Sequence, residues 1–173
     1  MVIIYERGEN MNLSYNPEGL RPYFQVDDSK RIRFLIESLS ILELKDIISR
    51  SFKNHSTVQC KVLIGYRYKG IRRKEKTNIG KFFTINNWYE EQLIGEDGIE
   101  YTFANIKSID VDELVRYCVK LKNGFRSAYI FFYKEDKTLY VNNDVFDIVS
   151  SDEKFINHIK RNYINKYDRL HEK

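Results

Sequence analysis

Residues 57–70 read TVQCKVLIGYRYKG, and this stretch sets the centre of the predicted fold. Apolar and aromatic side chains recur at every second residue of it, namely Val58, Cys60, Val62, Ile64, Tyr66 and Tyr68. Because every second side chain of a strand points to the same face, this spacing predicts one long strand with a buried face. Lys69-Gly70 predicts a turn after the strand, since glycine readily adopts the positive φ that tight turns need.

The residues that follow predict further strands joined by a hairpin. Lys81–Ile85 and Trp88–Ile94 have the composition of strands. The glycine-bounded residues 95–98 predict a hairpin loop that leads into a strand over Ile99–Phe103. We therefore expect a small antiparallel β module in this part of the chain.

Upstream of the central strand, residues 30–53 predict two short helices. Ser29 is a candidate N-cap, and apolar residues follow it at helical spacing: Ile32, Leu35, Ile36 and Leu39. Ser40-Ile41-Leu42-Glu43 has the capping-box pattern. This pattern predicts a break and a second helix that carries Leu44, Ile47, Ile48 and Phe52.

The last third of the chain predicts a second β block closed by a helix. Asn123-Gly124 is a strong hairpin signal, because both central residues of a type I′ turn need positive φ. It predicts one strand from Leu114 paired with another that ends near Phe132, and a further strand at Thr138–Val141. Ser151 then predicts the cap of a final helix whose apolar stripe is Phe155, Ile156, Ile159, Tyr163 and Tyr167.

Together these elements predict an α+β fold in three consecutive segments. Residues 1–56 are expected to hold a lead-in and two short helices, and residues 57–112 a small antiparallel β module. Residues 113–173 are expected to hold a β-hairpin block and the C-terminal helix.

The composition favours a globular binding protein. The 173 residues are 42% hydrophobic and 31% charged, which suits one domain with a packed core. The net charge of +4 is compatible with a polyanionic partner. No apolar run reaches the length of a membrane span and residues 1–10 lack the pattern of a signal peptide, so we expect a cytoplasmic protein with no membrane partner. Cys60 and Cys118 are accordingly expected to be buried reduced thiols rather than a disulfide.

The sequence shows no pattern typical of an enzyme. It contains no CxxC, HxH or HExxH motif and no glycine-rich phosphate loop, so we predict no metal and no cofactor. Its carboxylates occur as neighbours, such as Glu90-Glu91, which point to opposite faces of a strand. Glu43-Leu44-Lys45 has the Glu-x-Lys spacing of some nucleases but lies in a predicted helix. We therefore predict no catalytic residue.

Basic and aromatic residues alternate in one part of the β module. Cations neutralise phosphates and aromatic faces stack on bases, so this pattern is typical of nucleic-acid binding. An exposed hairpin tip kept soluble by its charge is the competing interpretation. The candidate binding residues are Tyr66, Arg67, Lys69, Arg72, Arg73, Lys74, Lys76, Trp88 and Tyr89.

Residues 58–111 resemble a WYL domain, the small Sm-like or SH3-like barrel of prokaryotic regulators. The resemblance runs through residues 62–70, basic Arg72 and Arg73, and residues 87–90, where Asn-Trp-Tyr-Glu stands in place of the Trp-Tyr-Leu signature. It ends in residues 98–109, where the family has a hairpin and a closing strand. Thr102 and Asn105 stand where the family has arginines that line its ligand cleft.

The resemblance implies a regulator or accessory factor of phage-defence or CRISPR systems that binds single-stranded DNA, RNA or a nucleotide. A second hypothesis is a phage or mobile-element protein that modulates a host defence enzyme by direct contact. The small size and the scarcity of alanine, typical of AT-rich genomes, favour this alternative. Either hypothesis allows the chain to form a homodimer.

Overall fold

The computed structural model describes residues 11–96 and 98–172. Within these residues, eight strands form one antiparallel sheet in the order β1-β8-β7-β6-β2-β5-β4, and β3 pairs with β2. The strands are β1 (Arg31–Leu35), β2 (Thr57–Tyr68), β3 (Ile71–Lys74), β4 (Trp88–Ile94), β5 (Glu100–Asp110), β6 (Ile130–Lys134), β7 (Lys137–Val141) and β8 (Val145–Ser150). The predicted α+β class is confirmed.

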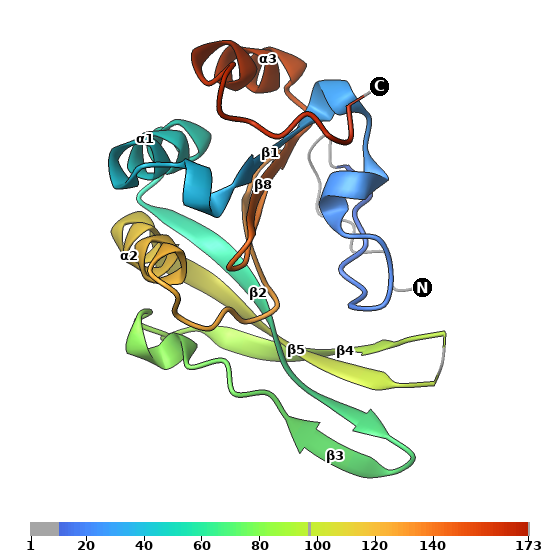
Figure 1. Cartoon of the computed structure of the whole chain (residues 1–173). Helices are drawn as coiled ribbons and strands as arrows, with labels where there is room; N and C mark the ends of the chain where they lie inside the picture. Colours follow the sequence, from blue (N-terminus) through green and yellow to red (C-terminus); the bar gives the residue numbers. More distant parts are fainter. Residues whose placement is uncertain (1–10, 97, 173) are drawn as a thin grey trace.

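Strand β2 organises the sheet because it has three partners. One side of it pairs with β5 along nearly its whole length. On the other side, residues 59–62 pair with β6 and residues 65–68 pair with β3. The sheet therefore forks beside β2, and Figure 1 shows the β2–β3 and β4–β5 hairpins reaching away from the helices.

Three helices in the described part of the chain, α1 (Ile41–Ser51), α2 (Val111–Lys122) and α3 (Glu153–Asn162), cover one face of the sheet (Figure 1). Their apolar stripes meet the strand residues of that face in one core, which includes Ile47, Tyr117 and Ile156 from the helices and Val62 and Phe132 from the strands. We call this side the helix face and the other side the open face.

Residues 11–30 cross part of the open face (Figure 1). Their main anchor is Tyr23, which is 2% exposed and lies under the guanidinium groups of Arg31 and Arg33. Arg33 donates two hydrogen bonds to Asp147, directly opposite on β8, at 2.6 and 2.7 Å. This buried bidentate pair joins the edge strand to its neighbour beneath the N-terminal segment.

Several predicted elements are confirmed. The long central strand, the strand Trp88–Ile94 and the strand over Thr138–Val141 are present at the predicted places. Gly98 donates its N–H to Gly95, which closes the predicted hairpin loop, although Asp97 lies outside the described residues. Ser40 and Glu43 form the predicted capping box at the start of α1.

The predicted helix over residues 30–39 is wrong. Residues 31–35 form strand β1 and a single 3₁₀ turn, Ile36–Ser38, follows. Ile32 and Phe34 lie on the buried side of this strand, so the period-two pattern of this stretch prevails over the helical one. The reason is tertiary, because the strand that pairs with β1 is β8, more than a hundred residues further along the chain.

The predicted β-hairpin around Asn123-Gly124 is also wrong. Residues 111–122 form helix α2, whose N-cap Asp110 accepts from the N–H groups of Asp112 and Glu113. Gly124 has φ of +85° and donates to Leu121, and Phe125 donates to Lys120. These two bonds are those of a Schellman motif, so the Asn-Gly pair ends a helix.

Three smaller predictions need correction. Residues 81–85 form no strand; a 3₁₀ turn at Ile79–Lys81 and an irregular segment run there. The N-cap of α3 is Asp152 rather than Ser151. Strand β8 was not predicted. Within the described residues the sheet is open, with β1 and β4 at its ends, so the expected SH3-like or Sm-like barrel over residues 57–112 is not confirmed. Strands from all three predicted segments join the sheet.

None of the helices in the described part combines the length and apolar content that a bilayer crossing needs. Cys60 and Cys118 are buried free thiols, as predicted, although Cys118 lies on a helix instead of a strand. Residues 1–10, on which the prediction about a signal peptide rests, lie outside the described residues.

Candidate functional site

The predicted basic cluster lies on the β2–β3 hairpin. Lys69 and Gly70 both have positive φ, at +48° and +77°, which is the geometry of a type I′ turn. All four residues of β3 are exposed, as are residues 67–70. The hairpin therefore presents its side chains to solvent from both faces.

A β-bulge in β2 decides which face each residue of the cluster occupies. The β2–β5 register shifts between Leu63 and Gly65, so one residue of β2 has no partner there. Because side chains alternate along a strand, this extra residue moves Tyr66 and Tyr68 off the helix face that Val62 occupies. Tyr66 accordingly packs beside Leu63 and Tyr101 on the open face. The prediction that all six alternating residues share one face is wrong from the bulge onward.

The register of the hairpin assigns each cation to a face. Arg67 lies opposite Arg72, and Lys74 lies opposite Gly65, so Arg67, Arg72 and Lys74 share the side of the helix face. Tyr66 lies opposite Arg73 and Tyr68 opposite Ile71, so these four side chains share the open face. The result is a ribbon with a cationic side and an aromatic side.

Most of these cations have no acidic partner. Arg67 pairs with Glu100 at 3.4 Å, where both side chains are well exposed. The ammonium of Lys69 lies 5.2 Å from the ring centroid of Tyr68. Among the described residues Arg72, Arg73, Lys74 and Lys76 take part in no ion pair within 4 Å. Unpaired surface cations of this kind keep their charge available to a polyanion.

Trp88 and Tyr89 start strand β4, away from the hairpin cations. Trp88 lies opposite Ile106 on the helix-face side, and Tyr89 lies opposite Asn105 on the open face. Both are about half exposed, at 52% and 50%. The structure therefore does not gather all the predicted site residues on one surface.

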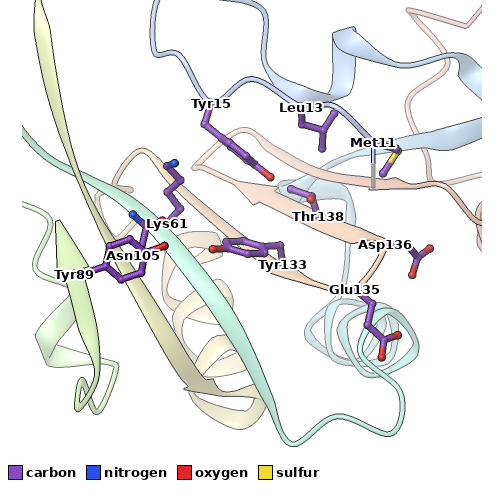
Figure 2. Close-up of a pocket in the computed structure, with 10 residues that line it drawn as sticks. All are labelled: Met11, Leu13, Tyr15, Lys61, Tyr89, Asn105, Tyr133, Glu135, Asp136 and Thr138. Carbon is purple, nitrogen blue, oxygen red and sulfur yellow. The ribbon is translucent and has the colours of Figure 1, made fainter. Parts of the chain in front are cut away.

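A cavity on the open face was not predicted. It has a volume of about 90 Å³ and lies between the sheet and residues 11–15. Figure 2 shows the residues that line it, which are Met11, Leu13, Tyr15, Lys61, Tyr89, Asn105, Tyr133, Glu135, Asp136 and Thr138. The signal in the sequence was Lys61, a charged residue in the middle of an otherwise apolar strand.

A partly buried ion pair lies beside the cavity. Lys61 is 2% exposed, and its Nζ donates to Glu91 at 2.8 Å. Asn105 donates to the same carboxylate oxygen at 3.0 Å. The Nζ also lies 5.2 Å from the ring centroid of Phe103. Burial lowers the pKa of Lys61, and the hydrogen bond and charge of Glu91 oppose that fall.

Three kinds of reactive group bear on the chemistry of these sites, namely metal ligands, thiols and the amine of Lys61. In the described part of the chain, no three His, Cys, Asp or Glu side chains gather closely enough to hold a metal ion. Burial raises the pKa of Cys60 and of Cys118, which keeps both thiols protonated. The reactive functional group of the cavity, the amine of Lys61, is held by Glu91.

Comparison with known proteins gives no relative: no family model, no curated protein and no solved structure matches this chain.

Proposed function

We propose that this chain is a non-enzymatic binding protein whose β2–β3 hairpin contacts single-stranded nucleic acid. The observation that carries the proposal is the set of unpaired cations on an exposed hairpin, above all Arg72, Arg73 and Lys74. Each phosphate contact releases condensed counterions from the strand, which favours binding at low salt.

The two sides of the ribbon suit the two parts of a nucleotide chain. The side with Arg67, Arg72 and Lys74 offers three cations to successive phosphates. The other side offers the exposed ring of Tyr68 to an unpaired base, with Arg73 beside Tyr66. Base stacking on aromatic rings needs unstacked bases, so the proposal favours single strands over duplexes.

The geometry favours a polymer over a free nucleotide. A small ligand needs polar groups that converge on a cavity, whereas the hairpin cations project outward into solvent. If the WYL resemblance holds, Asn105 marks one position of the family's ligand cleft, and this residue does line the cavity of Figure 2. The cation beside it, Lys61, is already paired with Glu91. An anionic nucleotide would therefore have to compete with a partly buried carboxylate.

Fluorescence anisotropy with labelled single-stranded RNA, single-stranded DNA and duplex DNA tests the proposal. We expect Arg72→Ala/Arg73→Ala/Lys74→Ala to weaken single-strand binding at low salt by at least about tenfold, and the slope of log K against log salt to become shallower by about 2. The matched control Lys53→Ala/Lys154→Ala/Arg161→Ala removes the same charge from exposed positions elsewhere. Equal losses in both variants, or stronger binding of the duplex, would overturn the proposal.

A second variant tests the geometry of the hairpin without changing its charge. A Cβ at Gly65 would lie 2.5 Å from the carbonyl oxygen of Arg73, so Gly65→Ala must push β3 away from β2. We expect it to weaken nucleic-acid binding severalfold. Gly80→Ala is the control, because a Cβ there meets nothing within 4 Å. Unchanged binding by Gly65→Ala would show that charge alone, without a formed hairpin, accounts for the affinity.

A further inference from the structure

Strand β4 is an uncovered edge of the sheet. It is last in the strand order and pairs only with β5 among the described residues. Two of its large apolar side chains are well exposed, Trp88 at 52% and Ile94 at 70%. An edge strand of seven residues with exposed apolar side chains is a template for another strand.

The other strand edges of the described fold are either covered or shorter and richer in charge than β4. The C-terminal segment covers β1, since Tyr167 bridges to Phe34 and Asp168 donates its N–H to the carbonyl of Arg33 at 2.8 Å. Strand β3 is four residues long and carries Arg72, Arg73 and Lys74, and a short charged edge resists pairing. The contrast indicates that β4 is left open for a partner.

The hydrogen bonds to β5 fix which residues of β4 face outward. Lys107 donates to Asn87 at 3.0 Å, and Gly95 donates to Ile99 at 2.8 Å. In an antiparallel pair the residues that bond to one neighbour alternate with those that point away from it. The even-numbered residues of β4, from Trp88 to Ile94, therefore direct their N–H and C=O groups toward the free edge.

We propose that β4 pairs with β4 of a second copy of this chain, antiparallel and centred on Glu91. In this register the outward-pointing residues face one another as hydrogen-bonded pairs, Trp88 opposite Ile94 of the second copy and Glu90 opposite its Gln92. The Trp–Ile pair joins two exposed apolar side chains, and such aromatic–aliphatic pairs stabilise a sheet. The carboxylate of Glu90 meets an amide that can donate to it.

The neighbouring registers that keep the same backbone bonding are less favourable. Centring the pair on residue 90 places two Glu90 carboxylates opposite each other, which is destabilising. Centring it on residue 92 moves Trp88 opposite Glu96. In the proposed register the residue at the dyad, Glu91, is held by Lys61 at 2.8 Å within its own chain, which neutralises the like-charge contact.

The size of the contact sets its strength. Seven residues from each copy form an interface well below the 20–30 residues a side of a standard one, so we expect a weak, concentration-dependent dimer. The inference is independent of the nucleic-acid proposal, because the hairpin cations lie on β2 and β3.

Cysteine cross-linking directly tests the register of the proposed β4–β4 pairing. We expect a mixture of the single variants Glu90→Cys and Gln92→Cys to form a disulfide-linked dimer, since facing residues of a hydrogen-bonded pair lie about 5.5 Å apart at Cα, within disulfide range. Each variant alone should cross-link far less. The native Cys60 and Cys118 are buried and do not interfere. Equal cross-linking by each variant alone would overturn the register.

Sedimentation velocity of the full chain over roughly a hundredfold range of concentration tests the dimer itself. Gln92→Pro removes an outward N–H that no described residue uses, and an edge strand tolerates proline there. We expect wild type and the control Gln92→Thr to associate as the concentration rises. We expect Gln92→Pro to keep the circular dichroism of the wild type and to stay monomeric. A wild type that is monomeric throughout, or a Gln92→Pro variant that associates equally, would overturn the proposal.

Discussion

At the scale of single residues, Lys61 shows how a charged side chain at a buried position indicates a site. It lies in an apolar strand, yet it is almost fully buried because Glu91 pairs with it and Asn105 bonds to the same carboxylate. A pair of charges taken out of water adds little net stability, but removing one partner leaves the other uncompensated. Hydrogen bonds at Glu91 thus link β4 to β2 and to β5 beside the cavity.

The Lys61–Glu91 pair gives a stability prediction with a defined pH dependence. We expect Glu91→Gln to lower the free energy of unfolding by about 2 kcal/mol at pH 7, because it strands the Lys61 ammonium. Between the lowered pKa of Lys61 and its ordinary value the unfolded chain binds more protons, so this residue contributes stability that rises with pH. Removing Glu91 lowers that pKa further and widens the window.

The loss in Glu91→Gln should therefore shrink as the pH rises toward about 10. Urea unfolding at several pH values measures it. Lys61→Met/Glu91→Leu is the control, since replacing both partners by apolar residues should recover most of the loss. If the loss of unfolding free energy in Glu91→Gln did not change with pH, the charge of Lys61 would not be its cause.

At the scale of elements, Asn123-Gly124 shows what a short motif determines. Both a type I′ turn and a Schellman motif need a residue with positive φ, and Gly124 has φ of +85°. The dipeptide thus predicts a backbone angle, while the choice between hairpin and helix end depends on the preceding residues. Leu114, Tyr117, Cys118 and Leu121 recur at helical spacing and bury one face of α2.

The C-terminus of α2 makes a direct stability test. Gly124→Ala places a Cβ in the left-handed region, so we expect a loss of roughly 1 kcal/mol in unfolding free energy. Gly80→Ala, whose backbone does not need glycine and whose Cβ meets nothing within 4 Å, should change stability little. Chemical denaturation of both variants measures the difference. If Gly124→Ala and Gly80→Ala were equally stable, the positive φ at the end of α2 would not be a determinant of the stability of the fold.

At the scale of the whole molecule, the sheet joins segments that are far apart in sequence. Strand β6 inserts between β7 and β2, and β1 pairs with β8 across more than a hundred residues. One core contains residues of all three helices and of strands β1, β2, β5, β6, β7 and β8. We therefore expect the chain to unfold as one cooperative unit.

The single Trp88, on the outermost strand, makes this testable. We expect urea unfolding followed by Trp88 fluorescence to coincide with unfolding followed by far-ultraviolet circular dichroism, which reports chiefly on the helices. The measurement is made at low protein concentration, where β4 is not occupied by a second copy. A fluorescence transition at clearly lower urea would instead mean that the β4 region unfolds before the rest.

The sequence by itself determined the elements whose signals are local. The spacing over residues 57–68, the glycines around the 95–98 loop and the Ser40–Glu43 capping box each predict a structure that depends on neighbours a few residues away. The burial of two reduced thiols was predicted as well. The candidate cations were identified from the local sequence. This succeeded because the two strands of the hairpin that exposes them are adjacent in the sequence.

Only the tertiary structure decided the rest. Residues 31–35 become a strand because β8 supplies their hydrogen bonds, and the bulge in β2 arises from pairing with β5. That bulge moves Tyr66 and Tyr68 off the face of Val62, and the pairing with β5 decides that Tyr89, rather than Trp88, lies on the open face. Strand pairing over long sequence distances leaves no periodic trace in either partner alone, so the open sheet and its uncovered β4 edge could not be predicted from residues 57–70.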